Sequence, residues 1–344
     1  MRADPLTPRR DFGDPGVELR HALDSCAVAQ RSHLSRLLAT GPDLLDLLHR
    51  LSTGDVRGLE PGRGRPTVVT TPKGRIVDRL FVHHLGQRGV LMVGGAGSAS
   101  RVAEHLARYA FAEDTGVADA TATTCHVAWV GPRAAEAVAA AGLPVPDTHA
   151  AVAATLDGVP VHVLGQDGWS AAGFSVVAEQ SAAAAVWESC VAAAARTDGG
   201  PAGERALDAY RVLRGIPIAG HELTSDYNPL EAGLWDAVSF DKGCYVGQEV
   251  VARLRTYDKV SRTIVRLDID VADGSSAPAP GTPLVVGGKP VGTLTSVAFP
   301  PGSPPTGLGY VKRRELEAGG DLRAGDSDSA PRARVVQVFG PGSA

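Results

Sequence analysis

Two segments of this chain carry the same order of structural signals. Residues 34–51, LSRLLATGPDLLDLLHRL, read as a short apolar strand, a Gly-Pro corner and an amphipathic helix. Residues 125–142, CHVAWVGPRAAEAVAAAG, repeat the strand, the Gly-Pro corner and the helix. Proline is tolerated just inside a helix start because its missing N–H would be unpaired there in any case. The repetition predicts a duplicated α+β architecture, with a pocket between the two related halves.

Each unit continues into further strands and a second helix. In the first unit we expect strands at 67–71, 74–84 and 89–93 and a helix at 98–111. In the second unit we expect strands at 159–164 and 173–179 and a helix at 181–195. The matching order of these elements, more than the Gly-Pro corners themselves, supports the prediction of a repeat.

After about residue 250 the pattern changes to short strands. Apolar runs at 260–271, 283–286, 291–297 and 335–339 are separated by proline- and glycine-rich joints at 277–282 and 300–308. Such a pattern predicts a small antiparallel β-barrel, and the Gly-, Asp- and Ser-rich stretch 317–333 is expected to be a mobile loop.

Because 344 residues exceed the usual size of one core, we expect more than one domain. The expected division is a region 17–250, made of two interleaved α+β units at about 17–120 and 121–250, and a barrel domain at 251–344.

Composition argues against several classes of protein. The formal net charge is −4 and aromatic residues make up 5% of the chain, so nucleic acid is not an expected partner. The apolar runs are too short for a membrane span, and the first residues lack the apolar core of a signal peptide. The four cysteines, Cys26, Cys125, Cys190 and Cys244, are scattered without a CxxC pair. We therefore expect no disulfide framework, no metal site, and a cytoplasmic location.

The segment 242–249, KGCYVGQE, is the most suggestive stretch for chemistry. Cys244 follows Lys242 closely and precedes a run, GQEVVARLRTY at 247–257, that reads as a helix with an acid at its start. A thiol ahead of a helix N-terminus and near a cation is expected to have a lowered pKa, and so to act as a nucleophile or a soft metal ligand. The alternative is a small buried cysteine in a glycine-cornered turn.

The longer stretch 228–254, NPLEAGLWDAVSFDKGCYVGQEVVARL, resembles the signature of the YgfZ-type folate-binding proteins, relatives of the glycine-cleavage T-protein (aminomethyltransferase). Further stretches resemble that family in the same order, at 39–56, 73–80, 209–222 and 291–299. The resemblance implies a three-module cloverleaf: two related α+β units around a central folate channel, plus a C-terminal antiparallel β-barrel. It also implies tetrahydrofolate, or a one-carbon derivative of it, as the cofactor.

The resemblance suggests which residues serve that channel, which we expect Cys244 to face. A pteridine needs flat apolar walls and a few polar groups, and its anionic glutamate tail needs a cation. Cys244 and Asp78 are the expected catalytic residues. Candidates for folate binding are Asp78, Arg79, Glu231, Lys242, Tyr245, Gln248 and Arg253, and Trp235 is a further candidate for aromatic surface.

Several positions depart from the T-protein pattern. Asp78 keeps the first of two adjacent acids, but the second position holds Arg79. The T-protein helix has Arg-Leu-Glu where this chain has RVL at 211–213, and its next strand ends in Asn-Ala where this chain has GG at 94–95. Aminomethyl transfer needs a carboxylate poised at the reacting amine. Such transfer is therefore not the favoured activity.

The favoured function is that of a tetrahydrofolate-binding protein in the assembly or repair of iron–sulfur clusters, with client or assembly proteins as partners. One thiolate cannot hold a cluster, which normally takes four ligands, so Cys244 would be a transient ligand or would exchange sulfur. The alternatives are a folate-dependent aminomethyltransferase of the T-protein type and a non-catalytic folate-binding scaffold. Whether the protein is an enzyme is left open by the sequence.

Overall fold

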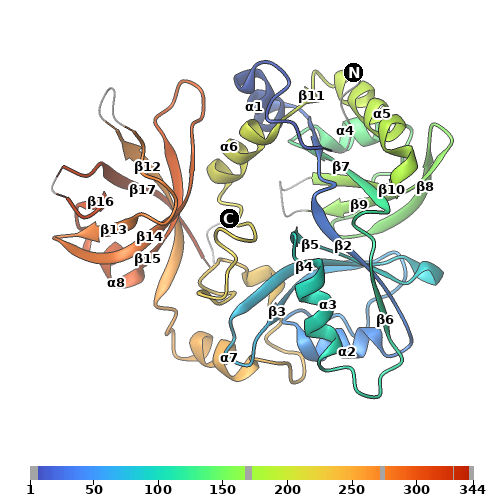
Figure 1. Ribbon diagram of the computed structural model, residues 1–344, viewed down its shortest axis with the longest axis horizontal. Coiled ribbons are helices and arrows are strands. Elements are labelled where there is room, and N and C mark those ends of the chain that lie inside the picture. The colour runs from blue at the N-terminus through green and yellow to red at the C-terminus, as the bar shows by residue number, and fades with distance from the viewer. Residues whose placement is uncertain (1–6, 167–172, 272–275, 328, 341–344) are drawn as a thin grey trace.

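The computed structural model describes residues 7–166, 173–271, 276–327 and 329–340. It consists of two sheets packed together, antiparallel except for the parallel pair of β1 and β11, and a closed barrel set apart from them, with helix α6 running between (Figure 1). This architecture confirms the predicted mixed α and β fold with a C-terminal barrel. None of the helices in these residues is long and apolar enough to span a membrane.

The two sheets repeat one topology. The first contains strands in the order β3 (Gly64–Thr70), β4 (Ile76–His84), β5 (Val90–Ala96), β2 (Leu34–Thr40) and β6 (Gly116–Asp119). The second has the order β8 (Ala151–Leu156), β9 (Val159–Gln166), β10 (Gly173–Glu179), β7 (Thr124–Val130), β1 (Ala27–Gln30) and β11 (Gly200–Pro201). Strand order 3-4-5-2 therefore matches order 8-9-10-7, and the duplication predicted from the sequence is confirmed.

The two units exchange their first strands. β1 precedes β2 in the chain but pairs with β7, while β6 precedes β7 but pairs with β2. Both pairings are antiparallel. The sequence does not indicate this exchange, because neither short strand has a repeat partner in its own sheet. The crossing of the chain between sheets at residues 31–33 places polar side chains at the centre of the molecule.

Helices cover the outer face of each sheet. α2 (Leu44–Leu51) and α3 (Ala99–Ala107) pack on the first sheet, and α4 (Ala134–Ala140) and α5 (Ala183–Ala195) on the second. The inner faces meet through a smaller apolar cluster that includes Phe81 and Val93 from one sheet and Leu164 and Val177 from the other. Successive side chains of a strand point to opposite faces of the sheet. Apolar residues of these strands therefore pack against the helices on one face and against the other sheet on the other face.

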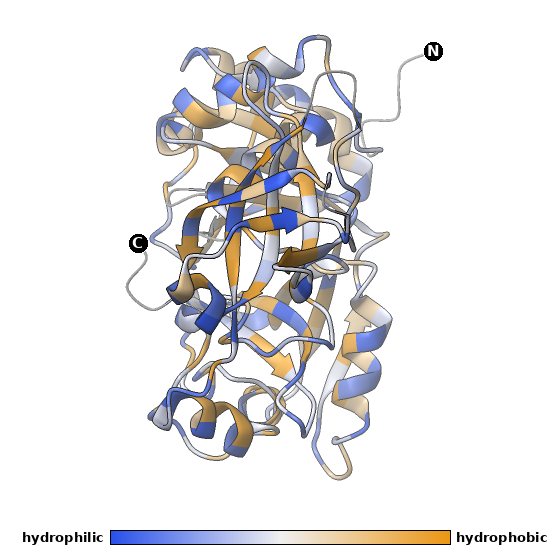
Figure 2. Cartoon of the chain, turned by 90° about the vertical axis from the view of Figure 1, so that its left-hand side faces the viewer, coloured by the Kyte–Doolittle hydropathy of each residue, from blue (hydrophilic) through white to orange (hydrophobic). Residues whose placement is uncertain are grey.

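The barrel closes in the order β12 (Arg262–Asp270), β15 (Thr306–Lys312), β14 (Lys289–Ala298), β13 (Pro283–Val286), β16 (Leu322–Ala324) and β17 (Arg332–Phe339). Val265, Leu267 and Ile269 alternate along β12 into its core, and Figure 2 shows hydrophobic and hydrophilic residues along the barrel strands. Two expectations are corrected. β15 begins within the stretch taken as a joint, and β16, paired with β13, lies within the stretch taken as a loop.

Three helices connect these parts. α1 (Pro15–Asp24) packs on α6 (Glu204–Arg214), and α6 contacts β14 and β15 of the barrel. α7 (Gln248–Thr256) confirms the helix expected after the 242–249 segment, and α8 (Arg313–Ala318) follows β15. The rings of Tyr227 and Tyr310 stack at 3.5 Å between centroids and join the segment after α6 to the barrel. These contacts hold α6 beside both sheets, where the main cavity lies.

Candidate functional site

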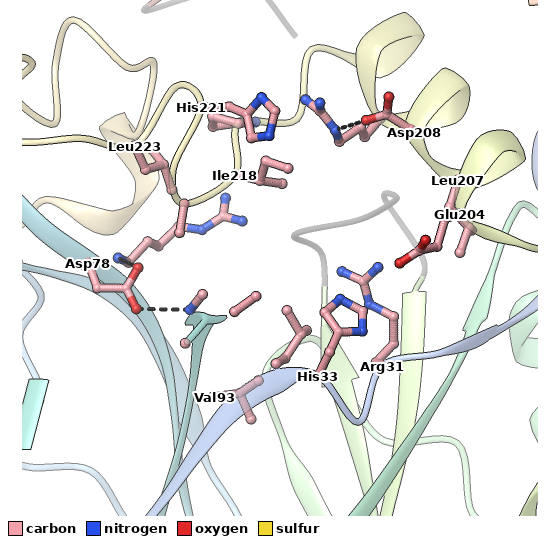
Figure 3. A pocket seen from close by; sticks show the side chains of 18 of the residues that line it. Arg31, His33, Asp78, Val93, Glu204, Leu207, Asp208, Ile218, His221 and Leu223 are labelled. Atoms are coloured by element: carbon pink, nitrogen blue, oxygen red, sulfur yellow. Dashed lines mark hydrogen bonds and ion pairs between the residues drawn. The ribbon is translucent and has the colours of Figure 1, made fainter. Parts of the chain in front are cut away.

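A cavity of about 600 Å³ lies where the first sheet, the β1–β2 connection and helix α6 meet (Figure 3). That volume falls in the range of small-molecule pockets. The apolar part of the wall is formed by Leu34, Phe81, Val93, Leu207, Pro217, Ile218 and Leu223. The polar part is formed by Arg10, Gln30, Arg31, His33, Asp78, Arg79, Glu204, Arg205, Asp208, Arg211 and His221. Apolar walls with a few converging polar groups are typical of a ligand site.

Asp78 lies on β4 at the inner end of this cavity and is 1% exposed. Its Oδ1 accepts a hydrogen bond from the Arg79 N–H at 2.9 Å. Its Oδ2 accepts from the Gly95 N–H at 2.8 Å and from the Ser98 hydroxyl. Burial raises the pKa of Asp78, while the three donors favour its ionised form. The carboxylate is thus held in one orientation at the cavity wall.

The glycine pair at 94–95 is explained by close contacts with Asp78 and Ala219. A Cβ atom on Gly94 would lie 2.7 Å from Asp78 Oδ2, and one on Gly95 would lie 2.3 Å from the Cβ of Ala219. Both distances are shorter than real side chains allow. Where the T-protein pattern has Asn-Ala, this chain thus has two glycines, and they allow β5 to approach the loop after α6 closely.

A buried ion network ties α6 to the barrel beside the cavity. Arg211, 2% exposed, pairs with Asp208 at 2.6 Å and with Glu222 at 3.3 Å. Its Nη2 also donates to the Ser296 hydroxyl at 2.9 Å. Glu222 is fully buried and accepts further hydrogen bonds from the hydroxyls of Thr295 and Ser296. Removing one partner of such a network leaves a buried charge unpaired, which costs far more than a surface pair.

Two polar side chains, one at the end of β1 and one in the β1–β2 connection, have atoms that lack hydrogen-bond partners within the described residues. Gln30 Oε1 and His33 Nδ1 are both buried atoms without a partner, and both residues line the cavity. Burial and the nearby Arg31 and Arg36 lower the pKa of His33 to about 4, so the ring is neutral at physiological pH. Buried polar atoms usually find a partner. These two are therefore available to a bound molecule or to water.

The 242–249 segment is anchored elsewhere. The Lys242 ammonium donates to three backbone carbonyls, of His49 at 2.6 Å and of Ser52 and Gly54 at 2.7 Å each. Two of these carbonyls lie at the C-terminal end of α2, where a cation is favourable. Burial lowers the pKa of Lys242 to about 8. Lys242 therefore fixes the segment to the first sheet's outer helix.

Cys244 is exposed, whereas Cys26, Cys125 and Cys190 are buried. The alternative of a small buried cysteine is thereby excluded for Cys244. It lies four residues before α7, whose N-cap is Gly247. However, Cys244 is not among the residues that line the cavity. The expectation that this thiol faces the channel is therefore not met. The anchoring of Lys242 on α2 accounts for this placement.

Most of the other predicted folate-binding residues also lie outside the cavity lining. Tyr245 is buried, with its ring centroid 5.0 Å from Lys242 Nζ, and Gln248 accepts a hydrogen bond from the Tyr245 N–H. Arg253 is exposed on α7. Glu231 is buried, with a raised pKa caused by burial, and contacts Arg75 at 3.6 Å. Of the predicted set, the structure brings Asp78 and Arg79 together at the cavity.

Residues outside the predicted set complete the site. The run QRSH at 30–33 and the polar face of α6, with Glu204, Asp208 and Arg211, supply most of the remaining polar lining. A signal existed for the first of these: four polar residues interrupt two apolar strands at the start of the first repeat. Phe81, rather than Trp235 or Tyr245, provides the aromatic wall, with the Arg79 guanidinium 5.0 Å from its ring centroid.

Comparisons with known proteins agree with this architecture. A family model, the GCVT N-terminal domain, matches residues 11–242. A putative chloroplastic transferase of Arabidopsis thaliana is 32% identical over 311 residues, which cover 88% of this chain and 69% of that protein. An aminomethyltransferase of Moorella thermoacetica is 30% identical over 332 residues, covering 94% and 88%.

The likeness extends to three dimensions. The crystal structure of the glycine cleavage system aminomethyltransferase T from Bartonella henselae superposes with a TM-score of 0.78. The aligned part covers 94% of this chain and 88% of that chain, at 23% sequence identity. At this identity the likeness establishes the fold, in which the barrel and both repeated sheets take part.

Proposed function

This chain belongs to the GCVT N-terminal domain family, and on that premise we propose that it binds a reduced folate, tetrahydrofolate or a one-carbon derivative, in the central cavity. The observation that carries the proposal is the cavity itself: about 600 Å³, walled by apolar side chains, with Asp78 buried at its inner end. A flat heterocycle with an amide edge and an anionic tail matches such a site in shape and polarity.

The residues present fit such a ligand. Phe81 is an aromatic lining residue, and Ile218 and Leu223 lie in the loop after α6, across the cavity from Val93 (Figure 3). Gln30 Oε1 and His33 Nδ1 are buried acceptors or donors without partners among the described residues. A pterin carries N–H and carbonyl groups on one edge, which would satisfy these atoms. The fit therefore rests on shape and on unfilled hydrogen-bonding capacity together.

We further propose that the protein acts in the assembly or repair of iron–sulfur clusters in client enzymes, with Cys244 as the reactive thiol. Cys244 is the exposed cysteine of the four, and the anchoring of Lys242 presents it beside α7. A partner protein could reach this thiol without entering the cavity. The thiol and the folate would then act at separate places, with the thiol as a transient cluster ligand or a carrier of sulfur. The proposed location is the cytoplasm, in keeping with four free cysteines.

A strain carrying Cys244→Ser tests this role. We expect aconitase-type and radical iron–sulfur enzymes to lose activity in that strain, while purified Cys244→Ser protein folds and binds folate as the wild type does. Cys125→Ser, at a buried cysteine, is the matched control for loss of a thiol. Unchanged iron–sulfur enzyme activity in the Cys244→Ser strain would refute the proposal.

Aminomethyl transfer is the second candidate, favoured by the names of the aminomethyltransferase relatives and by the buried Asp78. Against it, both oxygens of Asp78 already accept hydrogen bonds, from Arg79, Gly95 and Ser98. Reaction of the purified protein with an aminomethyl-lipoyl donor and tetrahydrofolate decides between the two. Formation of methylene-tetrahydrofolate, lost in Asp78→Asn, would establish the transferase.

A further inference from the structure

An exposed phenylalanine lies on the loop between α3 and β6. Phe111 is 89% exposed, the largest exposed fraction of any large hydrophobic residue in the described part of the chain. The loop reads YAFA at 109–112, and Ala112 is exposed as well. Single apolar residues are common on protein surfaces, but a fully exposed aromatic ring carries a large apolar area that burial against another molecule would remove from water. The ring is therefore suited to anchor a partner.

The loop around Phe111 is held in one conformation. The Glu113 carboxylate accepts hydrogen bonds from the N–H groups of Phe111 at 2.9 Å and Ala112 at 3.1 Å. Arg50 of α2 donates to the same carboxylate at 2.6 Å. The Arg50 hydrogen bond, together with the two N–H groups, lowers the pKa of Glu113 to about 2, so this carboxylate is ionised at physiological pH. Because the loop is already ordered, little conformational entropy is lost when the Phe111 ring is bound.

The segment that carries Cys244 is attached to the same arginine. The backbone carbonyl of Arg50 accepts a hydrogen bond from the Val246 N–H at 2.9 Å. Arg50 therefore contacts the Phe111 loop through its side chain and the Cys244 segment through its main chain. Figure 1 shows α2, α3 and α7 along one end of the molecule. A partner surface of ordinary interface size, about 800 Å², could cover both the Phe111 ring and the Cys244 thiol.

This end of the molecule carries an excess of negative charge. The stretches 43–57, 108–114 and 241–246, which we call the Phe111 face, contain six carboxylates and four lysines or arginines. The two arginines of the first stretch pair with acids of the same face, and Lys242 is buried. Within the described residues, four acids of this face form no ion pair with lysine or arginine: Asp43, Asp55, Asp114 and Asp241. Arg108 is the one arginine of the face without such a pair in that part of the chain.

We propose that the Phe111 face docks the iron–sulfur client protein, whose matching surface is an apolar pocket for the Phe111 ring surrounded by lysine and arginine side chains. This inference rests on the proposed role of Cys244 and adds the docking surface and the chemistry of the partner. Docking here brings the client to Cys244, because the Phe111 loop and the Cys244 segment are both bonded to Arg50. Buried aromatic anchors supply much of the affinity of protein interfaces, while charges at the rim orient the partner.

The first test uses cells that lack the protein and express it from a plasmid. Phe111→Ser should lower aconitase activity at least about fivefold, as Cys244→Ser does, because an anchor of this kind dominates binding. Phe299→Ser is the matched control, since Phe299 is 62% exposed but follows β14 of the barrel; it should keep wild-type activity. Purified Phe111→Ser should keep the wild-type urea midpoint and folate affinity, because the exposed ring supports neither the core nor the cavity.

The second test titrates purified apo-aconitase into the purified protein. Phe111→Ser should bind at least about tenfold more weakly than wild type, whereas Cys244→Ser should bind as wild type does. Raising the salt concentration should weaken wild-type binding. Asp43→Asn/Asp114→Asn removes two carboxylates but keeps the oxygen that accepts the N–H of residue 114, and it should weaken binding about threefold. Arg108→Ala should not weaken binding.

The outcomes separate this inference from the proposed function. If aconitase activity falls in the Cys244→Ser strain but not in the Phe111→Ser strain, the inference is overturned and the proposed role of the thiol stands. Absence of apo-aconitase binding to wild-type protein, or equal binding to Phe111→Ser, also overturns it. Weaker binding to Arg108→Ala with stronger binding to Asp43→Asn/Asp114→Asn would contradict a basic partner surface. Unchanged activity in the Cys244→Ser strain would refute the proposed function, and this inference with it.

Discussion

Replacing Lys242 by methionine should destabilise the protein by about 3 kcal/mol. The ammonium donates three hydrogen bonds at 2.6 to 2.7 Å to the carbonyls of His49, Ser52 and Gly54. Hydrogen bonds from a charged donor contribute about 1.5–3 kcal/mol each, or about 4.5–9 kcal/mol for three. Burial of the charge opposes them. Its pKa falls from 10.5 to about 8, which corresponds to a cost of about 3 kcal/mol.

Urea denaturation at pH 7 measures this difference as a shift of the unfolding midpoint at constant slope. Lys289→Met, at an exposed lysine of the barrel, is the matched control and should stay within about 0.5 kcal/mol of wild type. Because methionine also frees the segment from α2, Cys244 should become more mobile, and iron–sulfur activity in cells should fall with stability. A Lys242→Met protein as stable as the control would refute the view that the three carbonyls hold this segment.

Three further changes test other parts of the structure. Arg211→Met leaves Glu222 buried without its cation and should cost about 3–5 kcal/mol of unfolding free energy, measured by urea titration. Burial lowers the pKa of His83 to about 4 and that of His126 well below 6.5. The unfolded chain therefore takes up protons below about pH 6.5 that the folded state refuses, and stability should fall by about 2 kcal/mol per histidine between pH 7 and pH 5. Gly95→Ala should cost about 1–3 kcal/mol by overpacking and should weaken folate binding, measured by titration.

Each of these predictions has its own control. For Arg211→Met the control is Arg214→Met, which removes an exposed arginine of the same helix and should hardly change the unfolding free energy. His126→Phe should flatten the pH dependence, because both ring nitrogens of His126 lack partners among the described residues; an unchanged slope would contradict the assignment. Gly58→Ala, where an added Cβ meets nothing within 4 Å, should bind folate as wild type does. If Gly58→Ala and Gly95→Ala lost folate affinity equally, the effect of Gly95→Ala would not come from the cavity.

The sequence was sufficient to predict the repeated units because their signals are local. A strand, a Gly-Pro corner and a helix can be read within eighteen residues, and the structure contains them as β2–α2 and β7–α4. The exchange of β1 and β6 could not be predicted in this way. These strands have four residues each, and their pairing is decided by the opposite unit rather than by their own sequence.

The site was harder to predict for a related physical reason. Asp78 and Arg79 were found because they occupy a strand whose resemblance to the family is local. Gln30, His33 and Glu204 line the cavity because β1 crosses to the other sheet and α6 lies between sheet and barrel. Conversely, Lys242 is of a residue type that often binds anionic ligands, but its ammonium donates three hydrogen bonds to backbone carbonyls that lie far away in sequence.

Calorimetric titration of tetrahydrofolate into wild type, Cys244→Ser and Asp78→Asn tests the central claim most directly. Since Asp78 lines the cavity and Cys244 does not, we expect one folate to bind to wild type and to Cys244→Ser with equal affinity, and more weakly to Asp78→Asn. Absence of binding to the wild-type protein would contradict the claim, and so would a loss of binding in Cys244→Ser with binding intact in Asp78→Asn.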